Sequence, residues 1–87
     1  MSKFVYFAQR HSDQAIKIGY TSRVPERMAF LRLRFGDMTL LGLIPGTMSM
    51  ERQLHKKFSS YRIQGEWFTP EAALLSYIKG NANGLPR

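Results

Sequence analysis

The stretch FVYFAQRHSDQAIKIGYT, residues 4–21, contains two strand-like runs on either side of a polar turn. Residues 4–8 are aromatic or β-branched apart from the last, and residues 15–19 alternate isoleucine with lysine and glycine. The polar residues 10–14 between them make an antiparallel hairpin the simplest pairing. The hairpin is therefore the element from which the rest of the fold is predicted.

Lys17 and Gly19 share one face of the second strand of this hairpin, because side chains alternate along a strand. Two interpretations of this pair stay open. It belongs to an ordinary solvent-facing strand, or to a surface that a phosphate group approaches closely, where a glycine leaves room and a lysine supplies charge.

A helix and a third strand follow the hairpin. Pro25 favours the first turn of a helix, Glu26 suits its positive end, and Gly36 ends it. Residues 38–44 are an apolar run of strand length, and Pro45 stops it. A strand of this length can pair with the hairpin.

A second helix is predicted from a cap at Thr47 or Ser49 to about Phe58. At the spacing i, i+3, i+4 and i+7 of an inward helix face lie Glu51, Leu54, His55 and Phe58. A glutamate on that stripe needs a partner, a metal ion or water, because an unpaired buried carboxylate is costly. The inward face of this helix therefore indicates a candidate site as well as a packing surface.

Thr69 and Pro70 predict the start of a third helix. Its expected apolar face consists of Leu74, Leu75 and Ile78. The predicted order β-β-α-β-α-turn-α gives an α/β (α+β) fold, in which a three-stranded antiparallel sheet is packed by about three helices.

The composition limits the class of protein. At 87 residues the chain is expected to form a single domain over residues 1–79, with a flexible tail over residues 80–87 that is rich in glycine and asparagine. It has no cysteine, no apolar segment of membrane-spanning length and no signal-peptide pattern, so a cytoplasmic location is expected. The net charge of +7 points to a polyanionic partner, although charge kept for solubility alone is the other interpretation.

The motifs VYF (residues 5–7) and KIG (residues 17–19) resemble the paired strand motifs of the GIY-YIG nuclease superfamily. The ordered set IKIGYT, LLGLIPG, ERQLHKKF and GEWF is similar to one branch of small phage, mobile-element and fungal domains, some named meiotically up-regulated gene products. Phe4 stands where the first motif has glycine, and Lys17 stands where the second has tyrosine. The family's late asparagine has no clear counterpart. The resemblance would fit a phage or mobile-element origin of the chain.

The resemblance implies that Tyr6 holds or deprotonates the attacking water, Arg27 clamps the phosphate, and Glu51 binds one Mg²⁺ or Mn²⁺. Lys17 would contact the phosphate or act as the base. His55 would orient a water or protonate the leaving group. Each residue also has a structural alternative. Tyr6 would be an ordinary strand aromatic, Arg27 a solvated arginine and Glu51 an ion-paired glutamate. Lys17 would be a solvent-facing lysine and His55 a hydrogen-bonded structural histidine.

Nucleic-acid contacts are expected from Gly19, Thr21, Arg23, Arg32, Arg34, Lys56, Lys57 and Arg62. The predicted function is a small metal-dependent endonuclease that hydrolyses nucleic-acid phosphodiester bonds, with DNA favoured over RNA. The alternatives are a non-catalytic nucleic-acid-binding module on the same fold and, more remotely, a protein-binding domain. Trp67 and Phe68 are interpreted as a structural anchor, with base stacking by Trp67 as the minority interpretation. Oligomeric state and strandedness of the substrate stay open.

Overall fold

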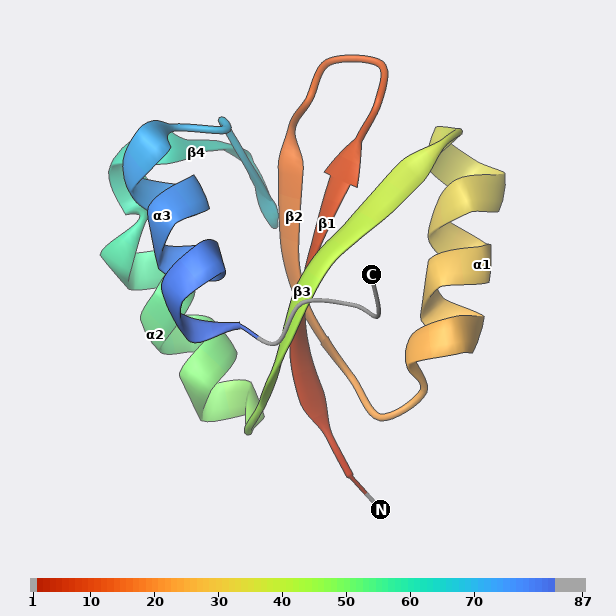
Figure 1. Ribbon diagram of the computed structural model, residues 1–87, viewed down its shortest axis with the longest axis horizontal. Helices are drawn as coiled ribbons and strands as arrows, with labels where there is room; N and C mark the ends of the chain where they lie inside the picture. The colour runs from red at the N-terminus through yellow and green to blue at the C-terminus, as the bar shows by residue number, and fades with distance from the viewer. Residues whose placement is uncertain (1, 83–87) are drawn as a thin grey trace.

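The hairpin of residues 4–21 lies in the middle of a five-stranded antiparallel sheet in the computed structural model, which describes residues 2–82 (Figure 1). The strands are β1 (Phe4–Arg10), β2 (Ile16–Thr21), β3 (Met38–Pro45), β4 (Arg62–Gln64) and β5 (Trp67–Phe68). Their order across the sheet is β3-β1-β2-β5-β4, and each neighbouring pair is antiparallel. The predicted three strands form the long part of the sheet, and the two short strands extend it beyond β2.

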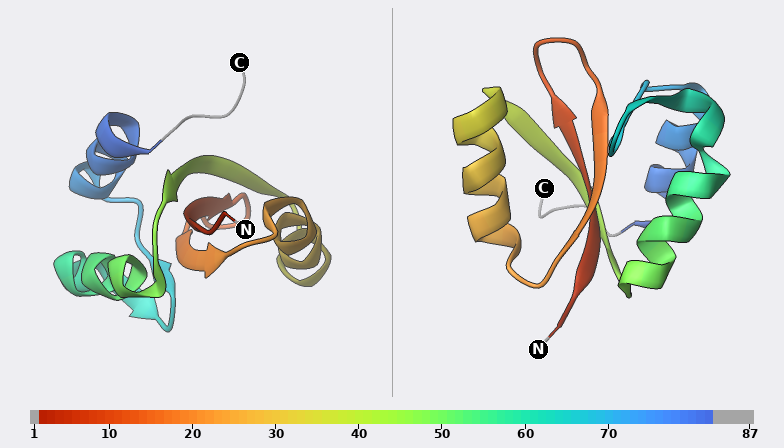
Figure 2. Two further views of the ribbon diagram at one scale, coloured as in Figure 1. Left: turned by 90° about the horizontal axis from the view of Figure 1, so that it is seen from below. Right: turned by 180° about the vertical axis from the view of Figure 1, so that it is seen from behind.

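Helices cover both faces of this sheet. They are α1 (Val24–Phe35), α2 (Met48–Lys57) and α3 (Ala72–Asn81), with a short 3-10 turn at Ser59–Tyr61. Figures 1 and 2 show α1 alone on one face and α2 with α3 on the other. None of the helices within residues 2–82 combines the length and the apolar character that crossing a bilayer requires.

Local sequence signals place the first two helices as predicted. Pro25 lies in the first turn of α1, and Gly36 follows its last turn with a positive φ of 84°, a conformation that glycine adopts at little cost. The Thr47 side chain caps α2 by accepting a hydrogen bond from the backbone N–H of Met50 at 3.3 Å.

Two apolar clusters form on the two faces, because alternate residues of β1 and β2 point to opposite sides. The larger cluster lies under α2 and α3 and contains Val5, Phe7, Ile16, Ile18, Leu54, Phe58, Phe68, Leu74 and Ile78. The smaller cluster lies under α1 and contains Tyr6, Ala8, Met28, Leu31, Met38 and Leu40. We call these sides the α2/α3 face and the α1 face.

The last third of the chain departs from the sequence predictions. The segment expected to be a turn forms the β4–β5 hairpin, with Gly65 at a positive φ of 57°. Helix α3 begins at Ala72 rather than Pro70, because the Thr69 hydroxyl lies 3.3 Å from the Tyr61 carbonyl and caps no helix.

The end of α3 also differs from expectation. Leu75, predicted to face the core, is 40% exposed, whereas Leu74 and Ile78 are buried as predicted. Gly80 and Asn81 belong to the last turn of α3, so the helix runs past the expected boundary at residue 79. The rest of the predicted tail, residues 83–87, lies outside the described residues.

Candidate active site

Tyr6 and Gly19 face each other across the β1–β2 pair, on the α1 face. A Cβ atom added to Gly19 would clash with Cζ and Oη of Tyr6, so the phenol ring occupies the space that any other residue's side chain would need. Gly19 thus makes room for the Tyr6 ring. This reason differs from the close phosphate approach expected from the sequence.

Arg27 lies above this pair at the end of the first turn of α1. Its Nη1 donates a long hydrogen bond of 3.5 Å to Oη of Tyr6. The two residues are 21 positions apart in the chain, and the fold brings them together because α1 packs across β1. The structure therefore joins the tyrosine and arginine that the sequence motifs singled out.

The Tyr6 side chain is only 1% exposed. Burial raises the pKa of its phenol above the usual value of about 10, and the hydrogen bond and charge of Arg27 lower it by a smaller amount. The negative charges of Glu66 and Glu51 add to the rise. Tyr6 is therefore a protonated phenol near neutral pH, and it needs added positive charge before it can act as a base.

Lys17 forms an ion pair with Glu66, with 3.0 Å between Nζ and Oε1. The Lys17 side chain is 15% exposed, and β5 holds its partner in place: the Glu66 carbonyl accepts a hydrogen bond from the Ile18 N–H at 3.0 Å. Sequence reasoning missed Glu66, although it lies in the GEWF motif. The sequence signal that could have identified it is a carboxylate placed just before the short strand that pairs with the Lys17 strand.

Glu51 projects from α2 toward the same group of charges and is half-buried. Burial raises the pKa of its carboxyl, the charge of Glu66 raises it further, and the nearby cationic groups lower it by less. Within residues 2–82, Glu51 forms no ion pair, and no three His, Asp or Glu side chains gather closely enough to hold a metal. A carboxylate in this state fits a largely hydrated Mg²⁺ or Mn²⁺ ion, which needs only one or two protein carboxylates.

His55, one turn after Glu51, has both ring nitrogens in hydrogen bonds. Its Nε2 lies 2.8 Å from the Ile18 carbonyl oxygen, which can only accept, so Nε2 carries the proton. Its Nδ1 then accepts a hydrogen bond from Nη2 of Arg62 at 3.3 Å. These contacts support the structural interpretation of His55, because neither nitrogen is free for a substrate or a metal.

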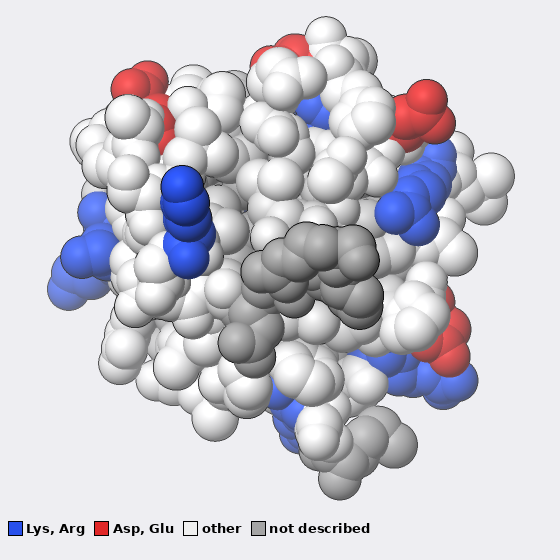
Figure 3. All heavy atoms as spheres, viewed as in Figure 1, with Lys and Arg blue, Asp and Glu red and all other residues white. Residues whose placement is uncertain are grey.

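The residues expected to contact nucleic acid do not form one surface. Arg32 and Arg34 lie on α1, whereas Lys56 and Lys57 lie on α2, on the opposite side of the sheet. On the face seen in Figure 3, lysine and arginine side chains are scattered among acidic and uncharged groups. The excess positive charge is therefore distributed around the molecule.

Several of these residues already have partners within the protein. The Thr21 hydroxyl is buried and accepts a hydrogen bond from the Arg23 N–H at 3.0 Å, which fixes the turn before α1. Arg23 pairs with Glu26 at 3.0 Å, and the Nε of Arg32 donates to the Met38 carbonyl at 3.3 Å. Thr21 and Arg32 thus tie α1 and its preceding turn to the strands, whereas the exposed Arg23–Glu26 pair lies at the start of the helix.

Comparison with known families adds the context for this geometry. A family model described as the T5orf172 domain matches residues 3–80. The chain belongs to this family. The T5orf172 domain is a GIY-YIG-related domain of phage and mobile-element proteins, which confirms the resemblance seen in the strand motifs. Comparisons with curated proteins and with solved structures gave no match.

The T5orf172 family is GIY-YIG-like and nuclease-related. Membership therefore implies nucleic acid as the partner and suggests a divalent metal ion. The GEWF motif that helps to mark this branch contributes Phe68 to the larger core, where it is fully buried. The anchor role expected of Phe68 agrees with that position.

Proposed function

We propose that this T5orf172 domain is a metal-dependent endonuclease that hydrolyses phosphodiester bonds of nucleic acid, with DNA favoured over RNA. One observation supports it above the others: Tyr6 lies on Gly19 with Arg27 donating to its hydroxyl at 3.5 Å. A buried tyrosine hydroxyl needs a hydrogen-bond partner, and here that partner is a charged guanidinium rather than a neutral group. An arginine at this place is also positioned for the oxygen atoms of a phosphate.

Arg27 has the main task in this proposal. Its guanidinium binds the scissile phosphate and stabilises the charge that grows on the phosphoryl oxygens in the transition state. Tyr6 keeps a water molecule or a phosphate oxygen in place through its hydroxyl, and its closeness to Arg27 favours proton loss once further positive charge arrives.

Glu51 would hold the divalent ion, since its carboxylate is half-buried beside Glu66 and without an ion-pair partner within residues 2–82. When bound, that ion supplies positive charge to the phosphoryl oxygens. Glu66 fixes Lys17 beside the site, so Lys17 contributes a positioned charge rather than a free one. We assign His55 to positioning β2 through the Ile18 carbonyl.

The alternative is a nucleic-acid-binding module that has kept the fold and lost cleavage. Two observations favour it: Tyr6 is 1% exposed, and Glu66 already neutralises the lysine that replaces the second motif tyrosine. A binder needs the cations of the site, whereas an enzyme also needs the half-buried Glu51. The two functions therefore differ in what a change at Glu51 does.

The test is cleavage of single- and double-stranded DNA by the purified protein with Mg²⁺, with Mn²⁺ and with a chelator. We expect metal-dependent cleavage that Arg27→Ala lowers about 100-fold or more, as loss of a transition-state charge contact does. Lys79→Ala, which removes an exposed cation from the last turn of α3, is the control and should cleave normally.

Glu51→Gln should abolish cleavage while leaving DNA affinity unchanged or higher, because it removes a negative charge from the site. Glu71→Gln, an exposed carboxylate just before α3, is its control. Tight, salt-sensitive binding without cleavage of any substrate would reject the enzyme and establish the binding module.

A further inference from the structure

Two aromatic side chains near Arg27 are accessible to solvent. Phe30, one turn after Arg27 on α1, is 56% exposed, and Tyr20 on β2 is half-buried. Trp67, the aromatic residue first considered for base stacking, is less available. The Arg10 guanidinium lies 4.1 Å from the centre of its ring, and Phe35 packs against it at 5.0 Å. Any base-stacking surface must therefore be sought elsewhere.

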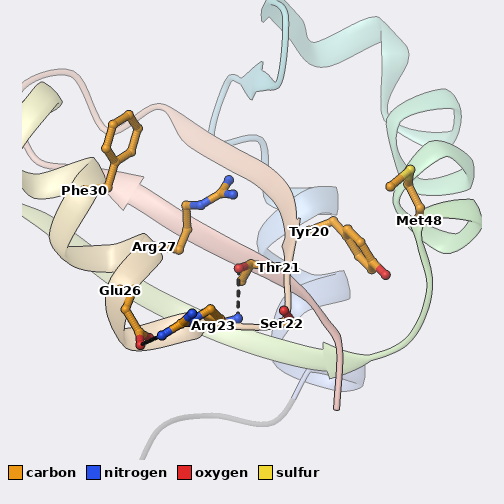
Figure 4. Close-up of a pocket in the computed structure, with 8 residues that line it drawn as sticks. All are labelled: Tyr20, Thr21, Ser22, Arg23, Glu26, Arg27, Phe30 and Met48. Atoms are coloured by element: carbon orange, nitrogen blue, oxygen red, sulfur yellow. Dashed lines mark hydrogen bonds and ion pairs between the residues drawn. The ribbon is translucent and has the colours of Figure 1, made fainter. Parts of the chain in front are cut away.

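Phe30 and Tyr20 line the same surface depression, which we call the Arg27 hollow. Its lining residues are Tyr20, Thr21, Ser22, Arg23, Glu26, Arg27, Phe30 and Met48. Its volume of about 560 Å³ lies in the range of ordinary ligand sites. Figure 4 shows Arg27 between Phe30 on one side and Tyr20 with Met48 on the other.

The hollow lies beside a free stretch of β2. Strand β5 pairs with β2 only at Ile16 and Lys17, and within residues 2–82 no strand pairs with residues 19–21 on the side away from β1. A chain entering here would run past Arg27 along the open edge of the sheet. The elements on either side of this path are α1 and the start of α2, which contribute Phe30 and Met48.

The charges in the hollow favour an anion at its centre. Arg23 and Glu26 neutralise each other through an ion pair of 3.0 Å, whereas Arg27 forms no ion pair within residues 2–82 and contacts only the uncharged Tyr6 hydroxyl by hydrogen bonding. The hollow therefore offers one available positive charge, flanked on both sides by exposed apolar groups. Met48, 52% exposed, adds to the apolar part.

We infer that the Arg27 hollow binds unpaired nucleotides, with Arg27 on a phosphate and the flanking bases against Phe30 on one side and Tyr20 and Met48 on the other. The faces of bases stack on aromatic rings, and they are reachable only when the bases leave the duplex. A duplex would offer Arg27 its phosphates, but its stacked base faces would be out of reach of Phe30 and Tyr20. The substrate class is single-stranded nucleic acid, or a single-stranded end or gap in a duplex.

This inference depends on the proposed function only in taking Arg27 as the phosphate contact, and its test needs no cleavage. Affinity is measured in chelator by fluorescence anisotropy with four labelled probes. These are an oligothymidine of about 12 nucleotides, within the range of single-strand sites, the same strand without bases, the matching oligouridine, and a duplex of equal length. The base-free strand keeps the phosphates and removes only what the aromatic groups contact.

We expect the oligothymidine to bind about fivefold or more tightly than both the duplex and the base-free strand. Phe30→Ala and Tyr20→Leu should each lower affinity for the oligothymidine about fivefold while leaving that for the duplex unchanged. Leu33→Ala is the matched control on α1, because Leu33 is 88% exposed and lies outside the hollow. The oligouridine probe distinguishes RNA from DNA as the source of the unpaired strand.

Equal affinity for the base-free and the normal strand would overturn the inference, as would variants that weaken duplex and single-strand binding alike. Thermal unfolding of each variant shows whether a lower affinity comes from a lost contact or from an unfolded protein. Phe30 is 56% exposed, so its truncation should leave the core intact. Single-strand preference without cleavage in any metal would keep this inference and reject the nuclease. Cleavage together with tighter binding to the duplex than to the single strand would reject this inference and keep the nuclease.

Discussion

The two faces of the central hairpin differ in what their side chains do. Toward α2 and α3, β1 and β2 contribute the fully buried apolar side chains of Val5, Phe7, Ile16 and Ile18, with the half-buried Gln9 and Tyr20 near the strand ends. Toward α1, the same strands contribute Tyr6, Ala8, Lys17 and Gly19. One face is an ordinary core, and the other holds a buried phenol, an ion-paired lysine and a glycine without which the phenol would not fit.

The comparison shows how an 87-residue chain accommodates both a core and a site. A small domain can bury little surface, so few residues can be set aside for function. The period-two alternation of the two strands places most of the core on one side and Tyr6, Lys17 and Gly19 of the candidate site on the other, whereas Glu51 of α2 comes from the core side. The following predictions test how far the α1 face and the α2/α3 face differ in what they contribute to stability.

Phe7→Ala should have the largest effect on stability, because Phe7 is fully buried on the α2/α3 face and packs against Tyr77. Removing the ring should lower the free energy of unfolding by about 3–5 kcal/mol, a large part of the total for a small domain. Urea unfolding measures it, and Phe7→Leu provides a milder variant if the first fails to fold. A loss below about 1 kcal/mol would show that this face is not the main core.

Gly19→Ala should lower stability by about 1–3 kcal/mol, because the added methyl group forces the Tyr6 ring out of its place. In a Tyr6→Ala background the same change should cost little, since the ring is gone. A double-mutant cycle of unfolding free energies measures this coupling.

Gly80→Ala is the control for that experiment, because a Cβ atom on Gly80 meets nothing within 4 Å. It should leave stability unchanged or raise it slightly through helix propensity. If Gly19→Ala costs the same with and without the Tyr6 ring, the two residues are independent, and the α1 face is not built around them.

Tyr6→Phe should change how stability depends on alkaline pH. Burial raises the pKa of Tyr6, so above pH 10 the unfolded chain loses the phenol proton before the folded chain does. Native stability is therefore intact below about pH 10 and falls as the pH rises above it, by at most about 1.4 kcal/mol at pH 11.

The phenylalanine variant lacks this loss, so the stability difference between the two proteins should shift in its favour from pH 8 to pH 11. Urea unfolding at the two pH values measures the difference, and groups other than Tyr6 cancel in it. A difference that stays constant across this range would contradict the buried state of the phenol.

The fold was largely predictable because its long elements have strong local signals. The alternating hairpin, Pro25 and Gly36 around α1, and the Thr47 cap of α2 all lie where the sequence indicates. The β4–β5 hairpin was missed because strands of three and two residues show no readable alternation, and tertiary pairing with β2 makes them strands.

The candidate site was predicted less completely, because its key contacts join residues distant in the chain. The sequence motifs named Tyr6 and Arg27, and the structure brings them within 3.5 Å. The partners of the other residues, such as Glu66 for Lys17, become visible only after β5 pairs with β2. Gly19 was singled out correctly as unusual, but the space it leaves is filled by the neighbouring strand.

Arg62→Met should have the smallest effect, and it tests how the α2/α3 face supports the site. Arg62 donates to Nδ1 of His55, while Nε2 of His55 donates to the Ile18 carbonyl next to Gly19. Arg62 is exposed, so losing its hydrogen bond should cost less than about 1 kcal/mol, whereas His55→Ala should cost more by leaving a strand carbonyl without its donor. Nitrogen-15 NMR of the His55 imidazole tests the same contact. The proton should lie on Nε2 in the native protein, and the tautomer with the proton on Nδ1 should be more populated in Arg62→Met. If the tautomer is unchanged in Arg62→Met, Arg62 does not orient His55, and the carbonyl of Ile18 alone fixes the ring.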